Sequence, residues 1–457
     1  MEAPVEKGFL VGVELKGEKH LWRVEDSVDE LAQLASTAGI EVVGRTIQRL
    51  ETPTPATYIG SGKVEELKAW KGELGYDVLL FDDELLPRQQ RNLEQELEVK
   101  VLDRTALILD IFASHASTKE GSLQVELAQY EYRLPRLTRM WTHLSRQAVG
   151  GVGLRGPGET QLESDRREIG RRIADLRRQL EEVRAHRRQY RNRRRKAAVP
   201  VVSIVGYTNA GKSTLLNALA GSDVLVEDKL FATLDPTTRR VELPNGSSVL
   251  FTDTVGFIHR LPTQLVAAFR ATLEEIDDSE LLVHVVDVTH PNVREQSTTV
   301  ERVLRELGVQ NKPVVTALNK IDLLVEELGE PGAADGTERE VEAATFLDRV
   351  TGMMQEFPNC VAISAAREIG LEALLRRVQE LLVEDLVSVL VVLPYSSDGL
   401  IGLLHRRGVV EREEYGQAGV TIEAKIPPTL AYQFEPYLVA ASPKGSVSLG
   451  RAAKQSR

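Results

Sequence analysis

The segment Gly206-Tyr207-Thr208-Asn209-Ala210-Gly211-Lys212-Ser213 decides the fold of this chain. It matches the P-loop pattern, it follows an apolar run at 201–205 that predicts a strand, and it opens a predicted helix. In that context, backbone N–H groups and the helix N-terminus point toward phosphate oxygens. We therefore expect all eight residues to line a nucleotide site, with Lys212 between the β- and γ-phosphates and the Ser213 hydroxyl on Mg²⁺.

Two downstream motifs supply the rest of a phosphate and metal site. Asp253-Thr254-Val255-Gly256 ends a predicted strand at 249–252. The Asp253 carboxylate is expected to hold Mg²⁺ through a water, and the Gly256 N–H to reach a γ-phosphate. Between these motifs, Phe231-Ala232-Thr233-Leu234-Asp235-Pro236-Thr237 is expected to form a nucleotide-contacting loop that gives Mg²⁺ a second hydroxyl. We assign this hydroxyl to Thr233, with Thr237 as the alternative.

A third pair of motifs predicts the base. Asn319-Lys320-Ile321-Asp322 follows a predicted strand at 314–318, and Ser364-Ala365-Ala366 follows the next one at 361–363. The Asp322 carboxylate can accept hydrogen bonds from both N1–H and N2–H₂ of guanine, a donor pair that adenine lacks. An unpaired buried carboxylate is costly, so the site is expected to select guanine. Asn319 and Lys320 would brace it, and a backbone N–H of the alanine segment would meet guanine O6.

The position after the Asp-x-x-Gly motif holds Phe257, where many regulatory GTPases carry the glutamine that orients the attacking water. Phenylalanine cannot hydrogen-bond to water, so we expect slow intrinsic hydrolysis and leave the catalytic residue unassigned. Asn209 has two interpretations that the sequence does not separate. It either helps to hold a monovalent cation such as K⁺ beside the phosphates, or it stabilises the turn.

Alternating strand-like and helix-like segments indicate an α/β protein of several domains. We predict an N-terminal α/β domain (1–121), two long antiparallel helical arms (122–197), a P-loop domain with a Ras-like order of motifs (198–386) and a small α+β domain (387–457). The arms are predicted at 122–148 and 159–196, separated by a glycine-rich loop at 150–158. Apolar residues at 162, 169, 173, 176, 180 and 183 predict a single seam between them. The acidic insert 326–342 is expected to be a mobile loop, and Gly60-Ser61-Gly62-Lys63 a turn.

Composition narrows the class of protein. The 457 residues include a single cysteine, Cys360, which excludes a disulfide framework and suits a reducing cytoplasm. We expect no membrane span and no export signal. The formal net charge is −11, yet residues 166–196 carry 14 Lys+Arg against 4 Asp+Glu. This segregation indicates a basic surface on the second arm of an otherwise acidic chain.

The chain resembles the HflX family of ribosome-associated GTPases, which belong to the translation-factor-related class. The carrying segments are Pro55 to Val64, Val101 to Thr105, Gln124 to Gln129 and, most specific, Gly153-Leu154-Arg155-Gly156-Pro157-Gly158-Glu159-Thr160-Gln161-Leu162-Glu163, together with the P-loop and Phe257. The sequence departs from the family pattern at Ser117-Thr118-Lys119, where a more basic stretch is expected. The resemblance implies an N-terminal domain with two arms, a Ras-like domain and a small C-terminal domain. It also implies binding to the large (50S) ribosomal subunit and either dissociation of stalled or idle ribosomes or a part in ribosome biogenesis.

Positive charge on the second arm fits an RNA partner. Eight bases and no acid lie between Arg184 and Lys196, a density that suits RNA phosphates through counterion release. We select Arg155, Arg187, Arg188 and Arg191 as RNA contacts. The alternative is a GTP-dependent switch that binds a protein partner through coiled-coil arms. We expect the protein to act as a monomer, although nothing in the sequence fixes the oligomeric state.

Overall fold

The computed structural model describes most of the chain: residues 5–17, 22–137, 157–197, 199–221, 230–231, 233–234, 236–260, 276–309, 311–326, 350–357, 359–384, 387–417, 419–426, 431 and 433–439. Contacts divide it into two units, Met1–Arg193 with Pro200–Val378, and Arg194–Val199 with Gln379–Arg457. No helix in the described ranges is long and apolar enough to cross a membrane.

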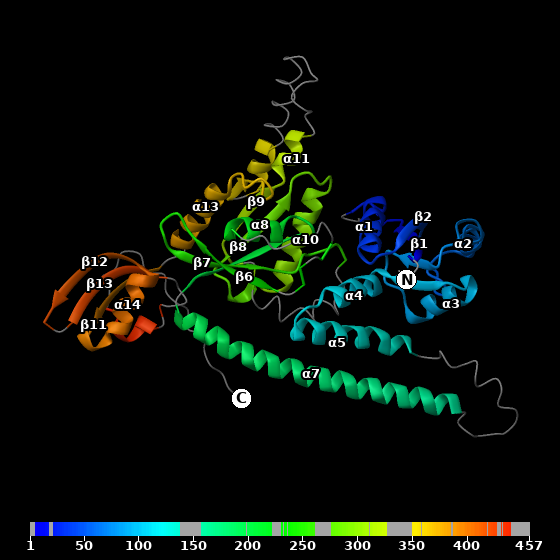
Figure 1. Cartoon of the computed structure of the whole chain (residues 1–457), viewed down its shortest axis with the longest axis horizontal. Helices are drawn as coiled ribbons and strands as arrows, with labels where there is room; N and C mark the ends of the chain where they lie inside the picture. Colours follow the sequence, from blue (N-terminus) through cyan, green and yellow to red (C-terminus); the bar gives the residue numbers. More distant parts are fainter. Residues whose placement is uncertain are drawn as a thin grey trace, which may run out of the picture. The chain divides into compact units, whose positions relative to one another are not determined.

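A six-stranded sheet carries the P-loop (Figure 1). Its order is β10-β9-β8-β5-β7-β6, and only the pair β6–β7 is antiparallel. The central strands are apolar and buried on both faces, as parallel sheets covered by helices require. This order confirms the Ras-like prediction. The elements are β5 (Val201–Gly206), α8 (Lys212–Ala220), β6 (Thr237–Glu242), β7 (Ser248–Asp253), β8 (Leu281–Asp287), α10 (Val293–Glu306), β9 (Val314–Asn319), α11 (Ile321–Glu326), β10 (Cys360–Ala362) and α13 (Leu371–Glu384).

A second, four-stranded parallel sheet forms the N-terminal domain, in the order β2-β1-β3-β4. Its elements are β1 (Lys7–Leu15), α1 (Val24–Thr37), β2 (Glu41–Leu50), α2 (Ser61–Leu74), β3 (Val78–Phe81), α3 (Pro87–Leu97), β4 (Lys100–Asp103) and α4 (Arg104–His115). Apolar residues of α2 and α3 join one core, whereas those of α1 and α4 join another. The second core continues into the P-loop domain through Tyr207, Phe231 and Phe257. The two domains are therefore packed together.

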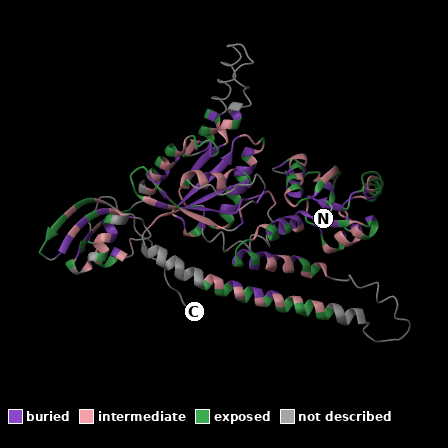
Figure 2. Cartoon of the chain, in the orientation of Figure 1, coloured by how far each residue is buried: buried purple, intermediate pink, exposed green. Residues whose placement is uncertain are grey.

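The arms are helices α5 (Lys119–Arg136) and α7 (Pro157–Ala197), which run side by side in opposite directions (Figure 1). Leu176 and Leu180 of α7 pack against Leu123 of α5. Charged pairs flank this seam, because Arg172 lies 2.6 Å from Glu126 and Arg177 lies 2.7 Å from Glu131. Along α7, exposed residues follow one another on the side turned away from α5, and the buried residues of this seam recur between them in the sequence (Figure 2).

The second unit contains a three-stranded antiparallel sheet of order β11-β13-β12. Its strands are β11 (Val387–Leu393), β12 (Val409–Gly416) and β13 (Gly419–Ile426), and α14 (Asp398–Arg407) lies between the first two in sequence. Val391, Leu404 and Ile422 are among its buried core residues. This α+β arrangement agrees with the expected fold.

Several elements differ from the sequence-based expectation. Helix α7 begins at Pro157, so the predicted glycine-rich loop ends two residues earlier than expected, because proline fits the first position of a helix. The predicted turn at Gly60 to Lys63 is instead the start of α2, with Gly60 as its N-cap. Strands β2 and β6 were not predicted. Residues 138–156 and most of the insert 326–342 lie outside the described ranges, and the domain boundaries stay a prediction.

Candidate nucleotide and metal site

The P-loop connects the end of β5 to the start of α8 with two residues in the left-handed region. Asn209 has φ 59° and Gly211 has φ 93°, and the second is the N-cap of α8. A side chain on Gly206 would lie 2.4 Å from the carbonyl oxygen of Val285, so glycine is required for the close approach to β8. The first N–H groups of α8 have no partner within the helix. This turn therefore presents backbone donors to an anion.

Lys212 is the charged group of this turn. Its side chain is buried, and its ammonium donates to the Tyr207 carbonyl oxygen at 2.7 Å. Burial lowers the pKa of Lys212 to about 8, although the nearby Asp253 carboxylate counteracts this effect. A Cβ atom on Gly256 would lie 2.9 Å from the Lys212 ammonium. The structure therefore brings the predicted lysine and glycine together.

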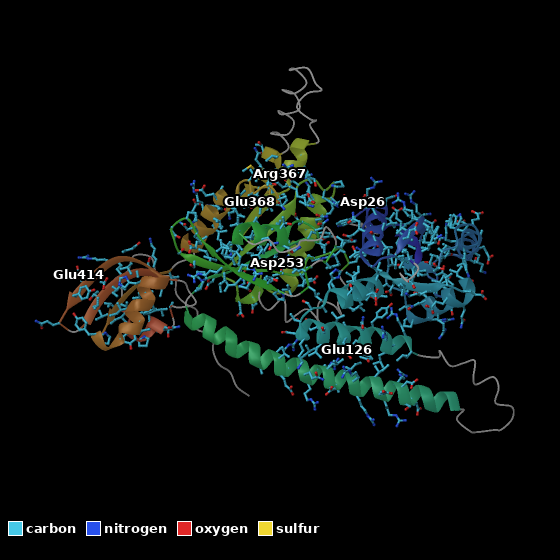
Figure 3. All side chains as sticks on the ribbon, viewed as in Figure 1. Asp26, Glu126, Asp253, Arg367, Glu368 and Glu414 are labelled. Atoms are coloured by element: carbon cyan, nitrogen blue, oxygen red, sulfur yellow. The ribbon has the colours of Figure 1, made fainter. Side chains whose placement is uncertain are left out.

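Three oxygen-bearing side chains from separate segments meet beside Lys212. The Ser213 hydroxyl lies 2.6 Å from the Thr233 hydroxyl and donates to Asp253 Oδ2 at 2.7 Å. Asp253 ends β7, near the middle of the P-loop domain (Figure 3). Burial raises its pKa, and its other oxygen, Oδ1, has no hydrogen-bond partner among the described residues. Hydroxyl and carboxylate oxygens are ligands that suit Mg²⁺. Thr233 reaches this cluster, whereas Thr237 begins β6.

Asn319 links the P-loop to the predicted base-reading segments. Its side-chain amide donates to the Ala210 carbonyl at 2.8 Å, and its oxygen accepts from the Ala365 N–H at 2.9 Å. The Lys320 ammonium lies 2.7 Å from Asp287, which fixes the lysine stem at the edge of the site. Asp322 is half-buried at the start of α11. The structure therefore gathers the three segments that the sequence assigns to one nucleotide.

Phe257 is buried and forms backbone hydrogen bonds with the P-loop on both sides. The Thr208 N–H donates to its carbonyl at 2.8 Å, and its N–H donates to the Gly206 carbonyl at 3.1 Å. Its side chain contributes to the core rather than to a polar surface. Asn209, in contrast, is a solvent-exposed residue of the P-loop turn.

Some predicted site residues cannot be placed. Ala232, Asp235 and Arg155 lie outside the described ranges. Arg187, Arg188 and Arg191 belong to α7, but their side chains are not among those described. Within the described part of the chain, no three His, Cys, Asp or Glu side chains form a metal cluster. The candidate metal position is therefore built mainly from hydroxyls.

Sequence reasoning missed a charged cluster of the N-terminal domain that reaches the P-loop. The Tyr207 hydroxyl donates to Glu30 of α1, and it accepts from the backbone N–H of His259. Arg104, at the start of α4, is buried and pairs with both Glu30 and Asp82. Arg104 lies inside one of the segments that carry the family resemblance, which is the only signal in the sequence that pointed to it.

The sequence matches three family profiles in succession. They are described as GTP-binding GTPase N-terminal (residues 25–113), GTP-binding GTPase Middle Region (115–194) and 50S ribosome-binding GTPase (201–320). Among curated proteins, the GTPase HflX of Caldanaerobacter subterraneus subsp. tengcongensis is 47% identical over 402 residues, 88% of each chain. The GTPase HflX of Escherichia coli is 40% identical over 413 residues, which cover 89% of this chain and 92% of that protein.

Identity at this level extends through the N-terminal domain, the arms and the P-loop domain rather than through the P-loop domain alone. It agrees with the order of the six-stranded sheet and with the motifs gathered around Lys212. The chain therefore belongs to the HflX family of GTPases, proteins that bind guanine nucleotides.

Proposed function

We propose that GTP is hydrolysed at the P-loop site with Mg²⁺ held by Ser213 and Thr233. The observation that carries this assignment is the meeting of both hydroxyls with Asp253 beside the Lys212 ammonium. When bound, Mg²⁺ would neutralise charge on the β- and γ-phosphates. Lys212 adds a second positive charge there, and Asn319 holds the turn against the base-reading segment.

Replacement of Lys212 by alanine tests this assignment. The change removes the phosphate charge, so affinity for GTP and GDP should fall by at least about tenfold, as measured by titration with a fluorescent guanine nucleotide. Thr233→Ala should instead weaken the dependence of GTP binding on Mg²⁺ and leave GDP binding largely intact, since Thr233 serves the γ-phosphate state. Unchanged nucleotide affinity in the Lys212 variant would show that the phosphates bind elsewhere.

Phe257 cannot orient the attacking water, because its side chain is apolar and buried in the core. We propose Asn209 as a ligand of a monovalent cation, because this P-loop residue is exposed and its side-chain oxygen is therefore accessible to an ion. GTP turnover should then be faster in K⁺ than in Na⁺ at equal ionic strength. Asn209→Ala should abolish this difference. A turnover rate that is equal in both salts would assign Asn209 to the turn alone.

We infer that the protein acts on the large ribosomal subunit and either separates stalled or idle ribosomes or takes part in subunit assembly. Support comes from the 50S ribosome-binding GTPase profile over residues 201–320 and from the basic segment Arg184 to Lys196. The arms also bury their apolar seam against each other through Leu123 and Leu176. This pairing leaves charge, rather than an apolar stripe, for a partner, which favours RNA over a coiled-coil protein. An RNA partner of this kind and the single cysteine favour a cytoplasmic location.

Co-sedimentation with purified subunits, in GDP and in a non-hydrolysable GTP analogue, tests the ribosome assignment. Binding should depend on the nucleotide and weaken steeply as salt increases. Arg187, Arg188 and Arg191 changed together to Glu should abolish binding and any stimulation of GTP turnover. The matched control reverses the exposed Arg166, Arg167 and Arg171 of the same helix and should retain binding. Equal binding by both triple variants would remove the basic segment from the interface.

A further inference from the structure

The P-loop turn contains a buried hydroxyl group that the fold itself does not use. Thr208 is 5% exposed, and its backbone N–H donates to the Phe257 carbonyl oxygen at 2.8 Å. Its side-chain hydroxyl, Oγ1, is shielded from solvent and has no hydrogen-bond partner among the described residues. A buried hydroxyl without a partner is costly, and native proteins pair most such groups. Valine would fill the same space without this cost, so the hydroxyl suits a partner that the folded chain does not supply.

Other threonines of the same domain show the usual arrangement. The Thr254 hydroxyl donates to the Ile204 carbonyl oxygen at 2.7 Å, and the Thr299 hydroxyl donates to the Glu295 carbonyl oxygen at 2.8 Å. Both threonines are fully buried. Among the threonines that the structure describes, Thr208 alone combines a solvent-shielded hydroxyl with the lack of a partner. The unpaired hydroxyl is therefore a feature of the P-loop turn and not of threonine packing in general.

The side chain of Thr208 lies beside the groups assigned to the terminal phosphate. The position that a Cβ atom would take on Gly256 is 2.9 Å from the Thr208 Cγ2 and 2.9 Å from the Lys212 ammonium. These two atoms are therefore at most twice that distance apart. Lys212 cannot accept a hydrogen bond from the hydroxyl, because an ammonium group only donates, and it already donates to the Tyr207 carbonyl oxygen. A γ-phosphate held by Lys212 and the Gly256 N–H would bring acceptor oxygens to this side chain.

We propose that the Thr208 hydroxyl donates to a γ-phosphate oxygen of GTP and thereby favours GTP over GDP. The inference rests on the function proposed above, in which Lys212 binds the phosphates, and on the expected contact of the Gly256 N–H with the γ-phosphate. Charged phosphate oxygens are strong acceptors, and a hydrogen bond to a charged group contributes more than one between neutral groups. GDP lacks this phosphate and leaves the hydroxyl unpaired, so the contact acts on one nucleotide only. Thr208 is thus a specificity-determining residue for the terminal phosphate.

The test compares Thr208→Val, which removes the hydroxyl and keeps the shape, with Thr208→Ser, which keeps the hydroxyl. Competition with a fluorescent guanine nucleotide measures the affinity of the full chain for GDP and for the β,γ-imido analogue of GTP, whose γ-phosphate oxygens are intact. We expect the valine variant to bind the analogue about tenfold more weakly and GDP equally well. The serine variant should bind both nucleotides within about twofold of the wild-type affinity. Because Ser213 and Thr233 are assigned to Mg²⁺, the dependence of binding on Mg²⁺ should not change.

The stability of the nucleotide-free protein separates a ligand contact from a structural role. Thr208→Val should unfold at the same urea concentration as the wild-type protein or at a higher one, because the change removes an unpaired buried hydroxyl. The matched control is Thr299→Val, which removes a buried hydroxyl that already has a partner within α10. This control should leave the affinities for both nucleotides unchanged.

Three results would overturn the proposal. A less stable nucleotide-free valine variant would mean that the hydroxyl has a partner within the protein. Equal losses for both nucleotides, or an unchanged ratio of their affinities, would separate the hydroxyl from the γ-phosphate. A serine variant that binds the analogue as weakly as the valine variant would assign the effect to side-chain shape. Retention of nucleotide affinity in Lys212→Ala would instead show that the phosphate assignment itself is wrong.

Discussion

At the scale of single residues, the replacement of Arg104 is expected to have the largest effect on the free energy of unfolding. It is buried between Glu30 and Asp82, so removing its charge leaves Glu30 without a cationic partner among the described residues and leaves Asp82 with only the longer contact to Arg260. We expect Arg104→Met to lower the free energy of unfolding by about 3–5 kcal/mol in urea titrations. The control is Arg45→Met, because Arg45 forms an exposed pair with Asp29 and should contribute almost nothing. Equal stabilities of the two variants would contradict this account.

A second prediction at this scale concerns Asp322 and the preference of the site for guanine. A carboxylate accepts from both guanine donors, whereas the amide of Asp322→Asn would present a donor toward one of them. GTP affinity should fall by at least about a hundredfold, and xanthosine triphosphate, which has a carbonyl oxygen at C2, should gain. Competition between the two nucleotides for a fluorescent probe measures the exchange of preference. An unchanged preference for guanine would assign base recognition to other groups.

At the scale of elements, the sequence predicts best where local chemistry alone decides the backbone. Strand β3 is a short apolar run and helix α3 begins at a proline, so the local sequence indicates both elements. Strand β2 was missed because all of its residues are half-buried or exposed, so it shows no apolar alternation. Strand β6 is an edge strand that contains two arginines and forms an antiparallel pair with β7. Elements formed by tertiary pairing leave a weaker pattern.

The seam between α5 and α7 gives the element-scale prediction. Leu176 is fully buried and packs with Leu123 and Leu180. Leu176→Ala should weaken the pairing of the arms by about 2–5 kcal/mol. Amide hydrogen exchange along α5 should become faster, while exchange in β5 and β8 should not change. Arg178→Ala, on the exposed side of α7, is the control and should leave the exchange of α5 unchanged. Unaltered protection of α5 in the leucine variant would show that the arms are held by their ion pairs.

At the scale of the whole molecule, the P-loop site was predictable and the domain interface was not. The motifs fix the positions of Lys212, Ser213, Asp253 and Asn319 because phosphate, metal and base impose those residue types at those strand ends. The contact between Tyr207 and Glu30 joins residues far apart in the sequence, and a buried glutamate in an amphipathic helix resembles any solvent-facing one. The burial of Glu30 becomes visible only when the N-terminal domain is packed against the P-loop domain.

Trp22 and His259 offer a direct measurement of the stability of that interface. It is buried and stacks on His259 at 5.0 Å and on Tyr207 at 5.8 Å between ring centroids. Burial, with Arg104 and Arg260 nearby, lowers the pKa of His259 to about 3, so the docked imidazole is neutral at every pH above that value. Unfolding exposes the imidazole to water and should return this pKa toward about 6.5.

In a variant with Trp70→Phe and Trp141→Phe, emission from Trp22 reports whether this interface is folded. The folded protein keeps His259 neutral, whereas the unfolded chain binds a proton at this residue with a pKa of about 6.5. The free energy of unfolding should therefore fall as the pH drops from about 7 to about 5, as measured by urea titrations that follow Trp22 emission. His259→Phe should remove this part of the pH dependence and keep the aromatic contact. The same pH dependence in both proteins would mean that His259 takes up its proton while it is still stacked on Trp22.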